Sequence, residues 1–309
     1  MDSIDLSTNI GSLKLKNPII AASGVFGYGL EYADLCPPEA LGAVVTKGVS
    51  IEASEGNPPP RTWETPSGML NAIGLENVGV DLFIKEKLPP LLERDATVIA
   101  NFYGSNVDEY AEVARRLGRA DGLAAIEANI SCPNVGAKKG LYFGSMPSSA
   151  AQVTRAVKDA TDRFLIVKLT PQVTDIAEVA VAVEEAGADA ISLINTIPAM
   201  AVDVRTRKPR LANITGGLSG PAIHPVAVRM VWEVSKAVSI PVVGVGGVMT
   251  AEDALELIVV GASAVQVGTA IFPRPSAPLE IIDGMRSLLQ QMNVPSISEL
   301  SGSIKIDPS

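Results

Sequence analysis

The stretch ANISCPNV at residues 128–135 contains Cys132, one of only two cysteines in the chain. Cys132 follows an apolar segment and stands three residues after Asn129. Most free cysteines are buried and structural, and Cys36, the other cysteine, fits either that role or surface exposure. Because the chain has a single histidine, His224, a thiol is the leading candidate for a group that transfers a proton. We therefore predict that Cys132 is reactive.

Polar side chains also end several other apolar segments. These are Lys47 and Lys168, and the amides Asn101, Asn129 and Asn195. Burying an ammonium or an amide without a partner costs several kcal/mol. Any one of them alone would most simply be a hydrogen-bonded structural group. Their recurrence at one segment end after another instead indicates a polar ligand.

Glycines follow the last two apolar segments, as Gly246, Gly247 and Gly268, with Thr269 next to the last. In barrels, backbone N–H groups at these two ends commonly hold a phosphate, although tight turns would need glycine too. The set of polar ends is larger than a small substrate requires, so we expect the phosphate to belong to a cofactor. The sequence GVGGVM lacks the G-x-G-x-x-G spacing, and no NAD site of the chain's own is predicted.

Lys168, in IVKLT, allows two kinds of chemistry. A buried barrel lysine can form a Schiff base, as in aldolases, but its polar neighbours here are amides rather than carboxylates. Facing a flavin ring, the same ammonium would stabilise negative charge on the reduced cofactor.

Short apolar segments alternate with helical patterns along the chain. The apolar segments are residues 17–24, 42–48, 97–104, 124–131, 164–170, 189–196, 241–247 and 264–270. Near-continuous apolar strands between helices are typical of a parallel sheet covered on both faces. Eight strand–helix repeats predict an α/β fold of the (β/α)8 TIM-barrel type, with chemistry at the carboxyl ends of the strands. A doubly wound open sheet is the alternative.

Capping residues mark the ends of several expected helices. The helical patterns occupy residues 106–120, 174–188, 250–262 and 277–292. Asn106, Thr174 and Thr250 are the predicted N-caps, and the second and third helices should end at Gly187 and Gly261.

Two connections, residues 49–96 and 197–217, are too long for simple barrel loops. Both follow predicted strand ends, so both should lie over the carboxyl-terminal mouth. They could be surface decoration, but their asparagines and glycines favour a lid or a pocket wall.

The composition excludes several classes of protein. Hydrophobic residues make up 47% and charged residues 19%, which is typical of a compact globular chain. A net charge of −9 disfavours a nucleic-acid partner. The first residues carry no signal-peptide pattern, and no apolar run reaches membrane-spanning length. We therefore expect a cytoplasmic location without membrane attachment.

Motifs along nearly the whole chain resemble one family. They are PIIAASGVFGYG, TKGVS, GNPPPR, GMLNAIGLEN, ANISCPNV, VKLTP, LINT, LANITGGLSGPAIHPVA, VGGV and VGTA. In this order they are similar to the class 1 dihydroorotate dehydrogenases, and RTRKPRLANITGGLSGPA looks like the NAD-linked subclass 1B. The family often has a Gly-Gly pair after the cysteine loop, whereas this chain has GAKKG.

The resemblance implies one FMN-binding (β/α)8 domain over residues 1–309, with insertions over the mouth. The residues that would hold FMN are Ser23, Lys47, Gly48, Asn101, Asn129, Lys168, Ile194, Gly220, Gly246, Gly247, Gly268 and Thr269. Those that would hold dihydroorotate are Lys47, Asn71, Ala72, Ile73, Gly74, Leu75, Asn129, Asn195 and Thr196. Cys132 would be the base that removes the C5 proton while a hydride leaves C6.

The resemblance also implies a partner. A subclass 1B catalytic chain would pass electrons to NAD through a subunit that carries FAD and a [2Fe–2S] cluster, as a homodimer within a heterotetramer. No metal site is expected in this chain. The missing NAD motif and the absence of spare cysteines agree with this division.

Other functions remain alternatives at this point. They are a fumarate-dependent class 1A enzyme, a dihydropyrimidine dehydrogenase-type flavin module, a tRNA dihydrouridine synthase, a Schiff-base aldolase and a non-enzymatic flavin-binding subunit. The acidic balance disfavours the tRNA enzyme.

Overall fold

Eight parallel strands close into a barrel in the computed structural model, which describes residues 4–131 and 143–306. In barrel order they are β10 (Ala190–Leu193), β15 (Val242–Val245), β16 (Ala264–Val267), β3 (Ile19–Ala21), β4 (Ala43–Val45), β7 (Val98–Phe102), β8 (Leu123–Asn129) and β9 (Leu165–Lys168). Each lies within one residue of a predicted apolar segment or inside it. The (β/α)8 prediction is confirmed, and the open sheet is excluded because β16 pairs in parallel with β3.

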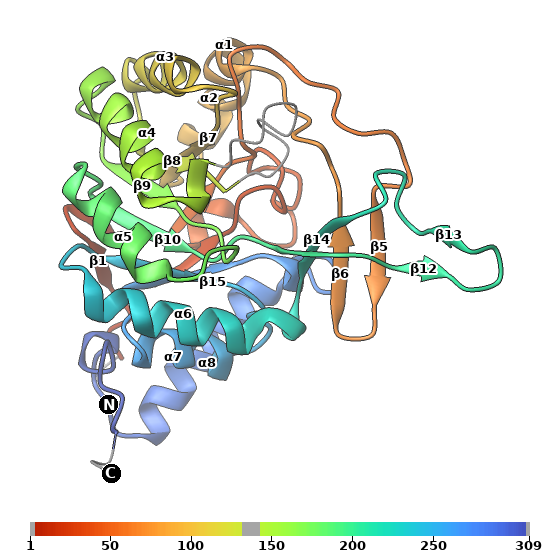
Figure 1. Cartoon of the computed structure of the whole chain (residues 1–309). Helices are drawn as coiled ribbons and strands as arrows, with labels where there is room; N and C mark the ends of the chain where they lie inside the picture. Colours follow the sequence, from red (N-terminus) through yellow and green to blue (C-terminus); the bar gives the residue numbers. More distant parts are fainter. Residues whose placement is uncertain (1–3, 132–142, 307–309) are drawn as a thin grey trace.

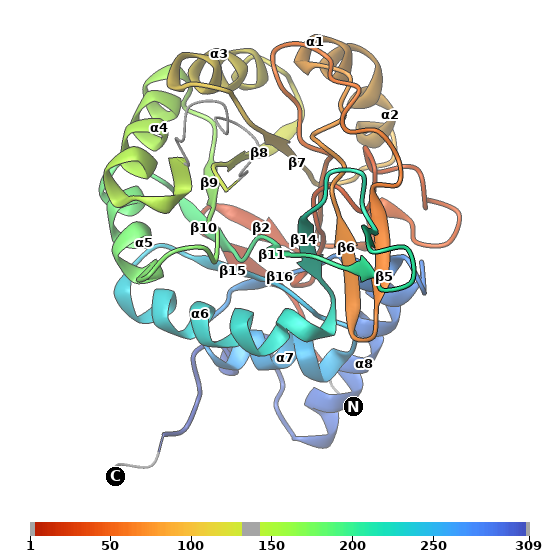
Figure 2. The same ribbon diagram turned by 45° about the vertical axis from the view of Figure 1, so that its right-hand side comes forward.

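Helices surround the barrel as an outer ring (Figure 2). The longer ones are α3 (Val107–Gly118), α4 (Pro147–Ala160), α5 (Ile176–Glu185), α6 (His224–Ala237), α7 (Ala251–Val259) and α8 (Ala277–Gln291). Between β4 and β7 the ring is completed by α1 (Val80–Leu82), the π-helix η2 (Phe83–Lys87) and α2 (Pro89–Leu92). Single 3-10 turns are η1 (Pro38–Ala40), η3 (Phe143–Ser145), η4 (Pro221–Ile223), η5 (Thr269–Ile271) and η6 (Ile297–Glu299).

Side-chain caps begin three of these helices. Asn106 caps α3 by accepting from Glu109 N, and Thr250 caps α7 within a capping box. The prediction of Thr174 as the cap of α5 is wrong, because the carboxylate of Asp175 accepts the first helical N–H groups. A carboxylate and a hydroxyl can both fill this position, and here the following residue supplies the cap.

The amino-terminal half of the barrel interior is an apolar layer. Its members are Ile20, Ala43, Val45, Ile99, Ala125, Ile166, Ala190, Val243 and Ala264. The hairpin of β1 (Thr8–Ile10) and β2 (Leu13–Leu15) packs onto this layer through Ile10 and Leu15, both buried. The hairpin therefore closes the amino-terminal end of the barrel, and we call these barrel side chains the lower layer.

The two long connections join in one antiparallel sheet beside the barrel (Figures 1 and 2). Its order is β11 (Ile197–Ala199), β14 (Gly216–Ser219), β6 (Gly68–Asn71) and β5 (Thr62–Thr65). Leu70, Ala72 and Leu211 form a small core for this sheet, here called the insertion sheet. Between β11 and β14 the chain projects outward as the hairpin of β12 (Val202–Asp203) and β13 (Lys208–Pro209).

Within residues 4–131 and 143–306, none of the helices combines the length and the apolar character needed to cross a bilayer.

Candidate active site

A polar layer lies directly above the lower layer inside the barrel. Side chains alternate between the two faces of a strand, so the residue two positions beyond an interior residue is also interior. On β8, Glu127 and Asn129 follow Ala125 on the same face. The same step on other strands gives Asn101, Lys168, Ser192 and Gln266. Polar residues thus occupy the half of the barrel nearer the mouth.

Glu127 is the centre of this polar layer, and its side chain has no solvent exposure. Its Oε2 accepts from Ser192 Oγ at 2.8 Å and from Gln266 Nε2 at 2.6 Å. Its Oε1 accepts from Asn101 Nδ2 at 2.7 Å. The ammonium of Lys168 lies 3.8 Å from the same Oε1, with its side chain 8% exposed. One carboxylate therefore contacts side chains from four other strands.

Two acceptors of this layer have no partner of their own. Asn101 Oδ1 and Gln266 Oε1 are buried and lack a hydrogen bond within the part of the chain that the structure describes. A buried, unpaired carbonyl oxygen is costly. These oxygens fit a ligand that brings N–H or O–H donors into the barrel mouth.

A second group of amides and hydroxyls stands at the rim. Asn129 Oδ1 accepts from Ser131 Oγ at 2.7 Å and faces Asn195 Nδ2 at 3.4 Å. Asn195 Nδ2 also donates to Ser131 Oγ at 2.8 Å, and Asn195 Oδ1 accepts from the backbone of Thr196 at 2.7 Å. The hydroxyl of Tyr110 holds the Asn129 carbonyl oxygen at 2.7 Å. The structure thus joins Asn129, Asn195 and Thr196 of the predicted site.

The predicted phosphate glycines converge at the ends of β14, β15 and β16. A Cβ on Gly247 would lie 2.8 Å from the carbonyl oxygen of Gly220, and both glycines have positive φ. A Cβ on Gly220 would in turn lie 3.5 Å from Thr269 Cγ2. Side chains at these positions would fill the loop, so its glycines keep backbone N–H groups accessible to an anion. Gly268, which precedes Thr269, is open apart from Ala22 and Val25 on its β3 side.

His224 contacts the backbone of this glycine loop. Its Nδ1 lies 2.8 Å from the carbonyl oxygen of Gly246, and its Nε2 lies 3.1 Å from Glu256 Oε2. His224 therefore links the loop to α7. Because both of its ring nitrogens are engaged in these contacts, we do not assign it as the base.

The remaining predicted cofactor residues lie around the same rim. Ser23 lies two residues after β3, and Gly48 lies close to Asn101, because a Cβ on it would be 2.6 Å from Asn101 Oδ1. Ile194 is buried after β10, bonded through its N–H to Val245 O at 2.8 Å. Lys47, at the end of β4, has its Nζ 4.0 Å from Glu76 Oε2, and Glu76 also pairs with Arg61.

The predicted substrate loop, residues 71–75, continues from β6. Its backbone carbonyls are held by three side chains: Asn57 bonds Ala72, Asn77 bonds Leu75, and Tyr103 also bonds Leu75. Gly74 and Leu75 both have positive φ, which turns the loop. Asn71 Nδ2 donates to Gly217 O across the insertion sheet. Asn71 to Leu75 are thus anchored beside the mouth.

The two cysteines differ in what the structure describes. Cys132 lies outside the described residues, so its role stays a prediction. Cys36 is fully buried, which settles the choice left open for it, and burial raises the pKa of its thiol to about 11. At pH 7 only about one Cys36 in ten thousand would be a thiolate. Cys36 is therefore unsuited to proton transfer.

Sequence reasoning missed Glu127, Gln266, Ser192 and Glu76. The first two carried a usable signal, because each is a polar residue inside an apolar strand, two positions before a predicted site residue. Glu76 had no such signal, since only the turn after β6 brings it to Lys47.

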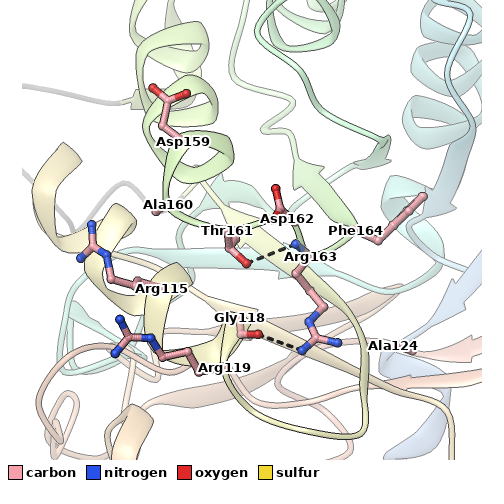
Figure 3. A pocket seen from close by; sticks show the side chains of 10 residues that line it. All are labelled: Arg115, Gly118, Arg119, Ala124, Asp159, Ala160, Thr161, Asp162, Arg163 and Phe164. Carbon is pink, nitrogen blue, oxygen red and sulfur yellow. Dashed lines mark hydrogen bonds between the residues drawn. The ribbon is translucent and has the colours of Figure 1, made fainter.

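A cavity of about 720 Å³ lies away from this site, between the carboxyl-terminal ends of α3 and α4 (Figure 3). Two of its three arginines, Arg115 and Arg163, are already engaged. Arg163 donates to the carbonyls of Leu123, Gly118 and Ala120, and Arg115 pairs with Glu112. The Arg163 contacts satisfy carbonyls at the end of α3 and at the start of β8, and among the described residues no unpaired buried acceptor lines this cavity.

Comparisons with known proteins agree with the geometry. A family model described as dihydroorotate dehydrogenase matches residues 5–289. A Trichlorobacter lovleyi protein named dihydroorotate dehydrogenase B (NAD(+)), catalytic subunit, is 55% identical, covering 97% of this chain and 98% of its own. The protein of that name from Pelobacter propionicus is 54% identical over 97% and 99%. The solved DHODH of Eimeria tenella in complex with ferulenol has a TM-score of 0.82 at 23% identity, over 97% of this chain and 88% of that one, and supports the fold.

Proposed function

This chain belongs to the dihydroorotate dehydrogenase family, and we propose that it is the catalytic subunit of an NAD-linked enzyme that oxidises dihydroorotate to orotate in pyrimidine biosynthesis. The observation that carries the proposal is the 55% identity to a relative of that name over 97% of the chain. Matches over nearly the whole length of both proteins favour a shared activity over a shared fold alone.

FMN is the cofactor that we propose for this chain. The unpaired oxygens of Asn101 and Gln266 fit the N–H donor of a flavin ring. The Gly220, Gly247 and Thr269 loop ends fit its phosphate. The predicted FMN residues all stand at strand ends around one barrel mouth, which supports the assignment. When bound, FMN would supply the hydride acceptor.

The chain's own residues would bind and orient the substrate. Dihydroorotate loses a proton from C5 and a hydride from C6, so one face of its ring must meet a base and the other the hydride acceptor. The amides of Asn129 and Asn195 are held together through Ser131 and can donate to or accept from the substrate ring. The ammonium of Lys47 can neutralise the substrate carboxylate. The Lys168 ammonium would stabilise negative charge that develops beneath the mouth.

Cys132 is the proposed base for the C5 proton. A thiol with a reference pKa near 8.5 ionises partly at neutral pH. Cys36 cannot replace it, since its pKa of about 11 keeps it protonated.

A partner subunit accompanies the proposed activity, because the relatives are named as catalytic subunits. We propose that this partner carries FAD and a [2Fe–2S] cluster, and that two catalytic chains and two partners form a heterotetramer. A cytoplasmic location belongs to the same proposal.

The test is anaerobic reduction of the purified chain. We expect a yellow protein with bound FMN, bleached by dihydroorotate and spectrally perturbed by orotate. Electrons should reach NAD efficiently only when the partner is present. Efficient NAD reduction by the chain alone would contradict the partner proposal, and rapid turnover with fumarate would indicate a class 1A enzyme.

The base is tested with a matched pair of cysteine variants. Cys132→Ser should slow flavin reduction by dihydroorotate by about 10²- to 10⁴-fold at pH 7, the range of general-base contributions. Cys36→Ser should leave that rate within about twofold, because the thiolate of Cys36 forms only as the pH rises toward its pKa of about 11. Stopped-flow absorbance measures both, and an unimpaired Cys132→Ser variant would show that another group takes the proton.

A further inference from the structure

The polar layer contains a pair of buried, oppositely charged groups, Glu127 and Lys168, and Glu127 has been given no role so far. Among the described residues, Glu127 is the only buried carboxylate and Lys168 the only buried ammonium. A charge is buried in a protein only with compensating partners. Glu127 has three hydrogen-bond donors besides Lys168, so its charge is compensated, and the question is what it does there.

Glu127 fixes the orientation of the two amide side chains that donate to it, Asn101 and Gln266. An ionised carboxylate only accepts hydrogen bonds, whereas an amide has one accepting and one donating end. Asn101 and Gln266 must therefore present their NH2 groups to Glu127, at 2.7 and 2.6 Å. Their oxygens then point elsewhere, and these are the same two buried oxygens that lack partners. The carboxylate determines which end of each amide is available to a ligand.

Glu127 also balances the charge of Lys168. The two groups lie 3.8 Å apart in a region with almost no solvent, where electrostatic interactions are weakly screened. A ligand above the layer therefore meets a nearly neutral pair. In the β8–β9 register Lys168 is level with Asn129, so Glu127 stands two residues deeper in the barrel than Lys168.

We propose that Glu127 is a positioning residue of this enzyme. Its carboxylate holds the oxygens of Asn101 and Gln266 toward the mouth as acceptors for ring N–H donors. It also moderates the field of Lys168, and so sets the reduction potential of the flavin. This inference rests on the proposed function, since it takes a flavin as the ligand.

Replacing Glu127 by glutamine keeps its volume and changes both properties. The new NH2 group faces either Asn101 Nδ2 or the donors from Ser192 and Gln266, so at least one amide must turn and offer a donor to the ligand. Lys168 loses its counter-charge, and the net charge of the layer rises by one. Added positive charge stabilises the electron-rich reduced flavin, which raises its potential.

The experiment measures FMN affinity and flavin reduction potential for the full chain and three variants. Glu127→Gln should weaken FMN binding at least tenfold. It should also raise the ratio of reduced to oxidised flavin at least tenfold at a fixed potential, a shift of about 30 mV for a two-electron couple. Lys168→Met should shift the potential in the opposite direction. The double variant, in which both charges are removed, should lie between the two single variants.

Controls separate positioning from mere destabilisation. Thr154→Val removes a buried hydroxyl from α4, where Thr154 Oγ1 bonds the Ala150 carbonyl of its own helix. It should leave FMN affinity and potential within twofold of wild type. If Glu127→Gln folds poorly, the double variant is compared with Lys168→Met instead, because replacing both members of a buried pair is far better tolerated than replacing one. The double variant should then bind FMN more weakly and have a higher potential than Lys168→Met, and equal values would overturn the role of Glu127.

The outcomes distinguish this inference from the proposed function. A wild-type chain that binds no FMN would overturn both. A wild-type chain that binds FMN and oxidises dihydroorotate, while Glu127→Gln keeps affinity and potential within twofold, would overturn only the role of Glu127. A double variant with the same potential as Glu127→Gln would also overturn it, since Lys168 would then not be the charge that Glu127 balances.

Discussion

The two layers of the barrel interior are built from the same strands and differ in what they do. On β7, Ile99 belongs to the lower layer and Asn101 to the polar layer, and on β9 the corresponding residues are Ile166 and Lys168. The lower layer is closed by the N-terminal hairpin, with side chains that only pack. Two residues further along β7, β8, β9, β10 and β16, polar groups appear, and among the described residues not all of their acceptors have a hydrogen-bond partner. On these strands, packing positions and candidate functional positions are thus only two residues apart on the same face.

The cavity between the carboxyl-terminal ends of α3 and α4 contrasts with the mouth of the barrel. Charge alone does not distinguish a site, since the guanidinium of Arg163 is used entirely on nearby backbone carbonyls. What distinguishes the mouth is that, among the described residues, Asn101 Oδ1 and Gln266 Oε1 are buried without a hydrogen-bond partner, which is rare in native proteins.

The largest effect is expected for Lys168→Met in the polar layer. Loss of the ammonium should slow flavin reduction by dihydroorotate by about 10²- to 10³-fold, as for other preorganised charge-stabilising groups. It also leaves Glu127 buried without its counter-ion, which should lower the free energy of unfolding by about 3–5 kcal/mol. Stopped-flow reduction and denaturant unfolding measure the two quantities.

Ile166→Val on the same strand is the control. It should lower the free energy of unfolding by about 1 kcal/mol and leave the rate of flavin reduction unchanged. Equal effects of both variants on this rate would contradict a functional difference between the two layers.

The next effect is expected for Ile99→Ala in the lower layer. Ile99 is fully buried, so this truncation should cost about 2–5 kcal/mol of unfolding free energy through lost burial and a cavity. The folded variant should bind FMN as wild type does, because no group of the polar layer changes. Urea unfolding and FMN titration test this, and a tenfold loss of FMN affinity would show that the lower layer also shapes the site.

The smallest effect is expected at the exposed rim, for Glu76→Gln. In the proposed site Glu76 would compete with the substrate carboxylate for Lys47, and its side chain is 39% exposed, so screening limits the interaction. We expect the KM for dihydroorotate to fall by about two- to fivefold, corresponding to at most ~1 kcal/mol. Glu64→Gln, on the exposed strand β5, is the control and should leave KM unchanged. A higher KM for Glu76→Gln would indicate that Glu76 mainly holds the substrate loop through Arg61.

Much of the barrel could be predicted from the sequence because its strands are buried on both faces. Such strands form continuous apolar runs, and a polar residue at the end of a run, such as Lys168 or Asn195, is conspicuous. Glu127 was missed because a carboxylate within a strand looks like an exception to the pattern. Its meaning depends on Gln266, 139 residues away along the chain, and no local pattern contains that information.

The insertion sheet could not be predicted for a related reason. The two connections were expected over the mouth, but their pairing joins Asn71 to Gly217, which are distant in sequence. Short strands such as β6 and β14, rich in glycine and polar residues, have weak local signals. The cap of α5 was missed by one residue because Thr174 and Asp175 are both good caps.

Because β6 pairs with β14, the two insertions form one structural unit, and we expect them to change together in evolution. β6 leads into the substrate loop and β14 leads into Gly220, and Leu70 lies opposite Leu218 in the register between them. A chimera that takes one insertion from a relative would combine mismatched halves of this sheet, whereas exchange of both together preserves the pairing. Among relatives, substitutions at Leu70 and Leu218 should accordingly covary, and a change of substrate preference should require coordinated changes in both insertions.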